Sequence, residues 1–350
     1  MFDLNHLPLS ALGIMFGISA AFVWMSGTRL AVLGDELAER LNLTREFVGL
    51  IFLAAATELP EIVTTITAAQ VGNAALVLGN MFGGISMQTA ILAVVDIFVV
   101  KHALTSWPRK STHTLLAVLL IVLLSFLLAV TFLGDVTVAL NIGLAAICLT
   151  GAYPVTIALL RAFDEKDSWA PVDLPEENDL EIGYRQKGHQ LGDLSTSRLI
   201  QRFVVSSLVI LIAGVLLALS AVSIAKNSPL GSSFVGIALL AAATSLPELS
   251  TTLAAARIGA YTMAMSNIFG SNLIMLALIL PADIAYRGGP ILGEADSSAQ
   301  FSIVAGILVT GIYAAGLLMR RTPRWLGAGL DSWLVLLVYF TTLYALFHIQ

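Results

Sequence analysis

The segment Val48–Ile97 begins with VGLIFLAAATELPEIVTTITAAQVGNAALVLGNMFGG. The segment Val235–Ile284 begins with VGIALLAAATSLPELSTTLAAARIGAYTMAMSNIFGS. The two segments align without a gap at a constant shift of 187 positions, and about 21 of the 50 paired residues are identical. Two unrelated apolar helices share Leu, Ala and Val by chance, but they do not share Thr, Pro, Glu, Asn and Asp at matched positions. The chain therefore contains an internal repeat.

The composition places this repeat in a membrane protein. Of the 350 residues, 57% are hydrophobic and 12% are charged, and the mean hydropathy is +0.89. Soluble domains carry about 25% charged residues, so a water-soluble fold is excluded. The single cysteine, Cys148, excludes a disulfide framework. The sequence has no basic stripe of the kind that binds nucleic acid, so no nucleic-acid partner is expected.

Ten stretches are long and apolar enough to cross a bilayer as helices, since a span needs about 20 such residues. We therefore predict an all-α polytopic membrane protein with ten transmembrane helices. The predicted spans are 9–33, 46–70, 73–100, 113–133, 137–161, 199–225, 233–256, 260–286, 299–320 and 329–347.

One change of composition divides these spans into two halves of five. Residues 163–198 are acidic and contain Pro and Gly, which predicts a solvated linker between an N-terminal half, 1–162, and a C-terminal half, 199–350. An odd number of spans in each half inverts the second copy relative to the first. Inverted repeats of this kind build many secondary transporters, whose substrate sites lie near the middle of the bilayer.

The basic residues predict the orientation. With the N-terminus outside, 16 of the 18 Lys and Arg residues fall in connections on the inner side, and only Lys226 and Arg287 fall outside. Lys and Arg concentrate on the cytoplasmic side of membrane proteins. We therefore expect both termini outside, the central linker in the cytoplasm, and a plasma (inner) membrane location.

Each repeat carries a glutamate directly after a proline inside an apolar span, Glu61 and Glu248, and the first repeat adds Glu58. A carboxylate at the bilayer centre costs about 2.5–3.5 kcal/mol on insertion scales. No Lys or Arg lies at a comparable depth to balance these charges. Protons or bound metal cations must therefore supply the positive charge.

The prolines predict the other ligands. A proline breaks or kinks a helix and frees backbone carbonyls, here around 54–57 and 241–244, and Thr57 and Thr244 add hydroxyls on the same segments. Carboxylate, carbonyl and hydroxyl oxygens suit hard cations such as Ca²⁺. We expect Glu61 and Glu248 to face each other across the pseudo-two-fold axis.

Two further pairs of polar residues occur in both repeats, and the sequence gives less reason to place them in the ion pathway. Asp96 and Asp283 lie near span ends, where we expect them to cap or anchor the chain. Asn80 and Asn267 either bind ions or hydrogen-bond between helices, and the sequence leaves both options open.

These motifs resemble the two α-repeats of the cation/Ca²⁺ exchanger superfamily. The resemblance is carried by Ala-Thr-Glu-Leu-Pro-Glu61 in the first copy, and by Ala-Thr-Ser-Leu-Pro-Glu248 and Ser-Asn-Ile-Phe-Gly-Ser-Asn272 in the second. It implies a secondary antiporter that exchanges Ca²⁺, or a similar divalent cation, for Na⁺ by alternating access, with the first and sixth spans sliding over a rigid core. It also implies a metal site made of Glu61, Glu248, Thr57, Thr244 and the carbonyls of Ala54 and Ala241, with monovalent sites at Ser245, Ser271 and Gln88.

The sequence departs from the family pattern at four positions. Glu58 replaces a serine, Gly84 and Ile85 replace Ser-Asn, and Met275 replaces an Asp or Asn. These departures keep open a proton-coupled or K⁺-involving exchanger in which Glu58 carries the proton. A cation channel is the alternative from another class. No catalytic constellation is present, so an enzyme is not expected; the expected ligands are transported cations, with the lipid bilayer as the other partner and no cofactor.

Overall fold

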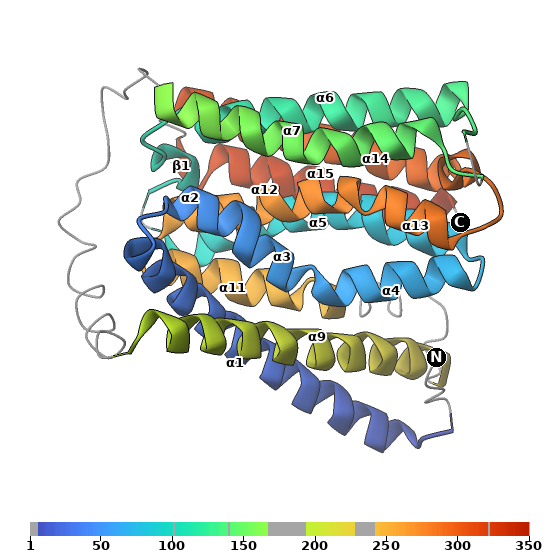
Figure 1. Cartoon of the computed structure of the whole chain (residues 1–350), viewed down its shortest axis with the longest axis horizontal. Helices are drawn as coiled ribbons and strands as arrows, with labels where there is room; N and C mark the ends of the chain where they lie inside the picture. The colour runs from blue at the N-terminus through green and yellow to red at the C-terminus, as the bar shows by residue number, and fades with distance from the viewer. Residues whose placement is uncertain are drawn as a thin grey trace.

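A computed structural model of the chain describes residues 6–100, 102–138, 141–166, 194–227, 242–320 and 323–349. Within this part the protein is a bundle of long helices that run side by side (Figure 1). The first half contains α1 (Leu9–Arg40), a broken helix described below, α5 (Ala74–Val99), the short η2 (Leu104–Ser106), α6 (Thr112–Leu133) and α7 (Leu144–Lys166).

The second half begins with α9 (Thr196–Asn227), and its remaining described elements follow the repeat. They are α11 (Leu246–Arg257), α12 (Tyr261–Ala277), α13 (Ile279–Ala285), the short η4 (Ile291–Glu294), α14 (Ser297–Met319), a hairpin of β1 (Arg324–Trp325) with β2 (Ala328–Gly329), and α15 (Leu330–Ile349).

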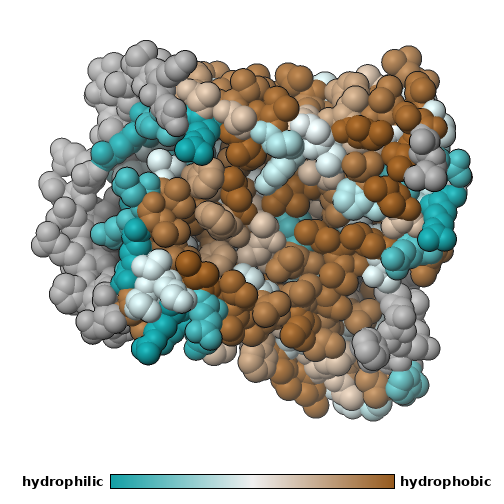
Figure 2. All heavy atoms as spheres, viewed as in Figure 1, coloured by the Kyte–Doolittle hydropathy of each residue, from teal (hydrophilic) through white to brown (hydrophobic). Residues whose placement is uncertain are grey.

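Eight described helices are long and apolar enough to cross a membrane, and a bent pair makes a ninth. The remaining predicted span, 233–256, is the seventh along the chain. The structure describes it only from residue 242 onward, a part that includes α11 up to residue 256. Hydrophilic residues gather at the two ends of the helices, and the flank between them is apolar (Figure 2). This surface is that of an integral membrane protein.

The central helices of the bundle are α5 and α12–α13, because 61% and 67% of their most apolar windows are buried, against 22% in α1 and α15. The helices α1 and α9 pack against each other, and together they lie against α11 and α4 (Leu59–Gln70). In Figure 1 this pair forms one side of the bundle, while α6 and α7 form the opposite side. The side chains that face the centre therefore come from both repeats.

Two span predictions need correction. The predicted span 137–161 begins later, at Leu144, because Gly134 (φ +84°) ends α6 and a bridge between Thr137 and Gly143 closes a loop before α7. The predicted span 46–70 is not one helix, since its two parts are bent by 48° between Thr57 and Leu59. Its first part contains α2 (Arg45–Phe47), the π-helix η1 (Val48–Leu53) and α3 (Ala54–Thr57).

Candidate cation-binding site

The break in the second span is the feature that positions the first two carboxyls. Pro60 lies in the first turn of α4 and has no N–H to donate to the carbonyl of Ala56, so the helix cannot continue straight through this point. Glu58 occupies the junction, and Glu61 lies in the first turn of α4. The N-terminus of a helix carries a partial positive charge that favours an anion there.

The second repeat builds the same arrangement. Pro247 and Glu248 lie in the first turn of α11, directly after Ser245. One carboxylate oxygen from each of Glu58, Glu61 and Glu248 lies within 4.8 Å of the other two. All three side chains are at most 1% exposed. The structure thus brings together the three glutamates that the sequence singled out.

The electrostatics of this cluster are unfavourable unless a cation or protons occupy it. Two unit negative charges 4.8 Å apart repel by about 3 kcal/mol at an effective dielectric constant of 20. The ion pairs in the described part of the chain involve acidic groups nearer the helix ends, at Asp35, Glu36 and Asp164. Among the described residues, no Lys or Arg pairs with the three buried glutamates.

The interior of the bundle contains oxygen atoms that could bind a cation, and several of them belong to the cluster itself. Within the described structure, these buried oxygens have no hydrogen-bond donor: Oε2 of Glu58, Oε2 of Glu61, both carboxylate oxygens of Glu248, Oε1 of Gln88, Oγ of Ser271, Oδ1 of Asn267 and Oδ1 of Asn272. Buried polar atoms in proteins normally have partners. A hard cation bound by oxygen ligands would satisfy several of them at once.

Several residues that the resemblance implies lie at this cluster. Gln88 on α5 donates from Nε2 to Oε1 of Glu58 at 2.6 Å. The hydroxyls of Thr57 and Ser271 lie beside the carboxyls of Glu248 and Glu58, respectively. Thr244 and Ser245 are buried just before α11. Ala241 lies outside the described residues.

The Ala54 carbonyl is less available than the resemblance implies. It accepts the backbone N–H of Glu58 at 3.0 Å and the hydroxyl of Thr57 at 3.2 Å. A carbonyl oxygen has two lone pairs, so a cation could bind Ala54 only if Thr57 turned away. The carbonyl that the proline deprives of its donor is that of Ala56, two residues later.

Asn272 is a further candidate ligand that the repeat pattern alone does not single out. Its Nδ2 donates to Thr89 at 3.3 Å and its Oδ1 is buried without a donor. The equivalent residue of the first repeat is Ile85, which has no polar group. The oxygen set is therefore asymmetric. The sequence does contain one indication that Asn272 belongs to the site: it is a polar residue inside an apolar span, five residues after the repeated Asn267.

Gly84 and Met275, two of the residues that differ from the family pattern, lie against each other in the structure. The Cε of Met275 lies 3.4 Å from the position that a Cβ at Gly84 would occupy. The thioether methyl thus packs over the glycine, and these two positions of the site contribute apolar contact in place of oxygen ligands.

Asn80 and Asn267 hydrogen-bond between helices. Nδ2 of Asn80 donates to Thr65 at 3.4 Å, and Nδ2 of Asn267 donates to Thr252 at 3.1 Å. Both pairs keep the 187-residue shift. This geometry favours the helix-to-helix role of the two asparagines, although Oδ1 of Asn267 is buried without a donor.

The two repeated aspartates anchor the chain, as expected. Asp96 accepts the backbone N–H of Leu104 at 2.7 Å and that of Gly329 at 2.8 Å. Asp283 accepts the backbone N–H of Ile291 at 2.6 Å and that of Gly143 at 2.7 Å. Each aspartate therefore ties its own loop to the residue just before the last helix of the other half.

Comparison with known proteins agrees with this fold. A profile of the sodium/calcium exchanger protein family matches residues 11–161 and 199–347, which together are most of the chain. The chain belongs to this family. It is a cation antiporter of the sodium/calcium exchanger family and an integral membrane protein, and members of this family are transporters rather than enzymes.

Individual relatives of this exchanger-family chain are more distant. It is 27% identical over 289 residues to the protein named "Putative antiporter CaxA" of Alkalimonas amylolytica, a match that covers 82% of this chain and 84% of that one. It is 37% identical over 91 residues to the inner membrane protein YrbG of Escherichia coli K12, and this match covers about a quarter of each chain.

Solved structures of the sodium-calcium exchanger NCX_Mj share the fold. A form soaked with 2.5 mM Na⁺ and 10 mM Sr²⁺ matches with a TM-score of 0.70 at 16% identity, covering 97% of this chain and 99% of that one. A form soaked with 10 mM Na⁺ and no Ca²⁺ matches with a TM-score of 0.67 at 19% identity, covering 96% and 99%.

Proposed function

We propose that this exchanger-family protein exchanges Ca²⁺, or a similar divalent cation, for Na⁺ by alternating access around Glu58, Glu61 and Glu248. The observation that carries the proposal is the meeting of these three buried carboxyls within 4.8 Å. Four of their six carboxylate oxygens are buried without donors, as are Oε1 of Gln88 and Oγ of Ser271 beside Glu58. In this proposal the cation is cargo, and the site binds it on Glu61 and Glu248 with Thr57, Thr244 and Ser271 nearby.

Exchange follows from competition for the same carboxylates. A divalent ion and its monovalent competitors both need these negative charges, so they cannot all bind together. If the site opens to one side at a time, it crosses the membrane with one kind of ion or the other. Coupling therefore requires only the shared ligands and alternating access.

Proton coupling is the second candidate, and the structure of the site gives it one supporting observation. Glu58 adds a third carboxyl to the cluster, while Gly84, Ile85 and Met275 contribute no oxygen ligand. Compared with the family pattern, the site thus has fewer oxygen ligands for Na⁺ and one additional group that can exchange protons. In this version Glu58 releases its proton as the divalent cation binds.

Purified protein in liposomes tests these candidates. Uptake of ⁴⁵Ca²⁺ is measured with an outward gradient of Na⁺, K⁺ or H⁺ imposed in turn, and ionophores clamp the membrane potential. The proposal expects uptake with Na⁺ inside and little with K⁺ inside. Uptake driven only by H⁺ would support the second candidate, and Ca²⁺ currents far above carrier turnover would indicate a channel.

We further propose that the protein has ten spans in two inverted halves, 1–162 and 199–350, joined by a cytoplasmic linker at 163–198, with both termini outside. The 187-residue repeat supports the inversion, as does the predominance of Lys and Arg in the connections assigned to the inner side. In the bundle, α1 begins and α15 ends at the same end (Figure 1). Reporter fusions at Gln350 and within the linker test the orientation, and a C-terminal reporter active in the cytoplasm would contradict it.

A further inference from the structure

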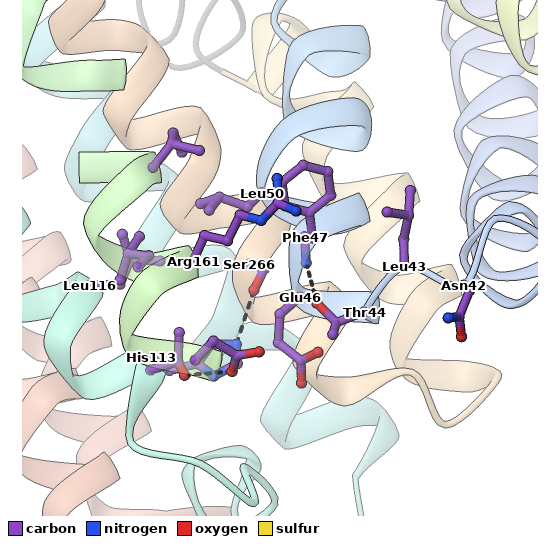
Figure 3. A pocket seen from close by; sticks show the side chains of 14 residues that line it. Asn42, Leu43, Thr44, Glu46, Phe47, Leu50, His113, Leu116, Arg161 and Ser266 are labelled. Carbon is purple, nitrogen blue, oxygen red and sulfur yellow. Dashed lines mark hydrogen bonds between the residues drawn. The ribbon is translucent and has the colours of Figure 1, made fainter. Parts of the chain in front are cut away.

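The described part of the molecule contains a cavity whose lining includes none of the three clustered glutamates. It has a volume of about 250 Å³ and is lined by residues of α2, η1, α6, α7 and α12, together with the loop before α2 (Figure 3). Its polar residues come from the ends of these helices that lie on the predicted cytoplasmic side. Hydrophilic residues gather at the helix ends (Figure 2), so in a bilayer we place these residues at the level of the lipid head groups.

The walls of this cavity change from polar to apolar along the helix axes. Each of three segments contributes a polar residue at the helix end and an apolar residue four positions farther into the span, which is about one turn, or 6 Å, deeper. The pairs are Glu46 with Leu50, Thr112 with Leu116, and Arg161 with Ile157. A cavity graded in this way fits an amphiphile that lies parallel to the helices.

The charges at the mouth of the cavity leave one carboxylate for a ligand. Asp164 already pairs with Lys110 at 2.9 Å and accepts the hydroxyl of Thr112 at 3.0 Å. The ring of His113 is hydrogen-bonded to Ser266 at 3.0 Å. The half-buried Glu46 has no hydrogen bond or ion pair within the described part of the chain.

A positive charge lies at the same mouth. Arg161 extends toward Phe47, so its guanidinium and the Glu46 carboxylate both belong to the rim of the cavity (Figure 3). An acidic and a basic group at one mouth match a zwitterionic head group.

We propose that this cavity binds the head group of a membrane aminophospholipid such as phosphatidylethanolamine. The ammonium donates to the Glu46 carboxylate, the phosphate faces Arg161, and the first methylenes lie against Leu50, Leu116 and Ile157. The cavity is smaller than the roughly 300–1,000 Å³ of pockets that enclose drug-sized ligands, so it takes the head group and leaves the acyl chains in the bilayer.

Native mass spectrometry of the full-length protein in detergent tests the proposal. The protein is mixed with phosphatidylethanolamine or with phosphatidylcholine of the same acyl chains, whose quaternary ammonium has no N–H to donate. We expect at least about tenfold preference for phosphatidylethanolamine, the size of a hydrogen bond to a charged group. Glu46→Gln removes the preference, and Glu39→Gln, which changes an exposed carboxyl at the same end, keeps it. Equal retention of the two lipids by the unaltered protein would overturn the proposal.

A second pair of variants tests the cavity itself. Ile157→Trp fills the apolar wall and is expected to abolish selective retention, whereas Val155→Trp, at a position that is 58% exposed on the same helix, leaves it unchanged. Glycerophosphoethanolamine has the head group without acyl chains, and we expect it not to displace the lipid at equal concentration. Displacement, or unchanged retention in Ile157→Trp, would contradict the lipid site. These readouts do not involve ion exchange, so this proposal and the proposed function fail separately.

Discussion

Gln88 donates a 2.6 Å hydrogen bond to Oε1 of Glu58, and the other oxygen of Glu58 is buried without a donor. The amide thus orients the third carboxyl of the cluster and leaves its second oxygen directed to a cation or a proton. Glu58 is the acidic residue that has no counterpart in the second repeat, where Ser245 occupies the equivalent position. It is therefore the residue most able to change the coupling ion.

Glu58→Ser makes the first repeat like the second and should change which gradient drives Ca²⁺ uptake. Removing this carboxyl leaves two negative charges for a divalent ion and removes a competing proton acceptor. We expect the ratio of H⁺-driven to Na⁺-driven uptake to fall, and the loss of uptake at acid pH to become shallower. Liposome uptake measured between pH 6 and pH 8.5 checks both. An unchanged ratio and pH profile would mean that Glu58 takes no part in coupling.

Glu61→Gln and Glu248→Gln should each abolish exchange in a protein that still inserts. Each change removes one charged ligand from the cluster but keeps the shape of the side chain. A loss of more than about 1.4 kcal/mol in cation binding lowers the affinity more than tenfold. Initial rates of ⁴⁵Ca²⁺ uptake measure the effect, with thermal melting in detergent as the folding control. Near-normal uptake by either variant would remove the assignment of the site.

The repeat made the centre of this site predictable. The pairing of Glu61 with Glu248 follows from two facts in the sequence: each glutamate lies directly after a proline in an apolar span, and the two copies are related by one constant shift. The helix break at Pro60 follows from the chemistry of proline. These features depend on local residues and symmetry, which a sequence contains directly.

Other features depend on packing and could not be predicted. The contact between Met275 and Gly84 joins residues 191 positions apart, and neither repeat alone indicates it. The availability of the Ala54 carbonyl depends on which rotamer Thr57 adopts. The late start of α7 depends on a loop in which Asp135 and Asp283 accept backbone N–H groups of Ala145 and Gly143. Apolar composition alone does not reveal such a loop.

Asp96→Asn should lower stability and leave cation affinity unchanged. Asp96 accepts from Leu104, Gly329 and the hydroxyl of Ser332, and an asparagine would direct an N–H group toward one of these donors. Hydrogen bonds to buried charged groups contribute about 1.5–3 kcal/mol each, so we expect a loss of about 2–3 kcal/mol.

Thermal unfolding in detergent measures this loss. The matched control is Asp296→Asn at the N-cap of α14, where asparagine caps about as well as aspartate. Asp283→Asn should behave like Asp96→Asn, because Asp283 holds the equivalent two backbone N–H groups. Reduced Ca²⁺ affinity with unchanged melting would instead assign these aspartates to the ion pathway.

Gly214→Ala should impair both stability and transport more than Gly27→Ala. The two glycines are related by the 187-residue shift. Gly214 faces Pro60 at the helix break of the first half, and Gly27 faces Ser250 and Thr251 of α11 in the second half. A Cβ at Gly214 would lie 2.4 Å from Cγ of Pro60, a ring that cannot move aside, so α9 must shift away from the carboxyl site. A Cβ at Gly27 first meets the hydroxyl of Ser250, which can rotate.

Overpacking of this kind costs about 1–3 kcal/mol, so we expect a lower melting temperature and slower Ca²⁺ uptake for Gly214→Ala. Gly17→Ala on α1 is the control, because no other atom lies within 4 Å of a Cβ there and alanine favours the helix. Equal effects at positions 27 and 214 would mean that Pro60 yields to the added methyl. The close contact between α9 and the break at Pro60 would then not limit how these two helices move past each other.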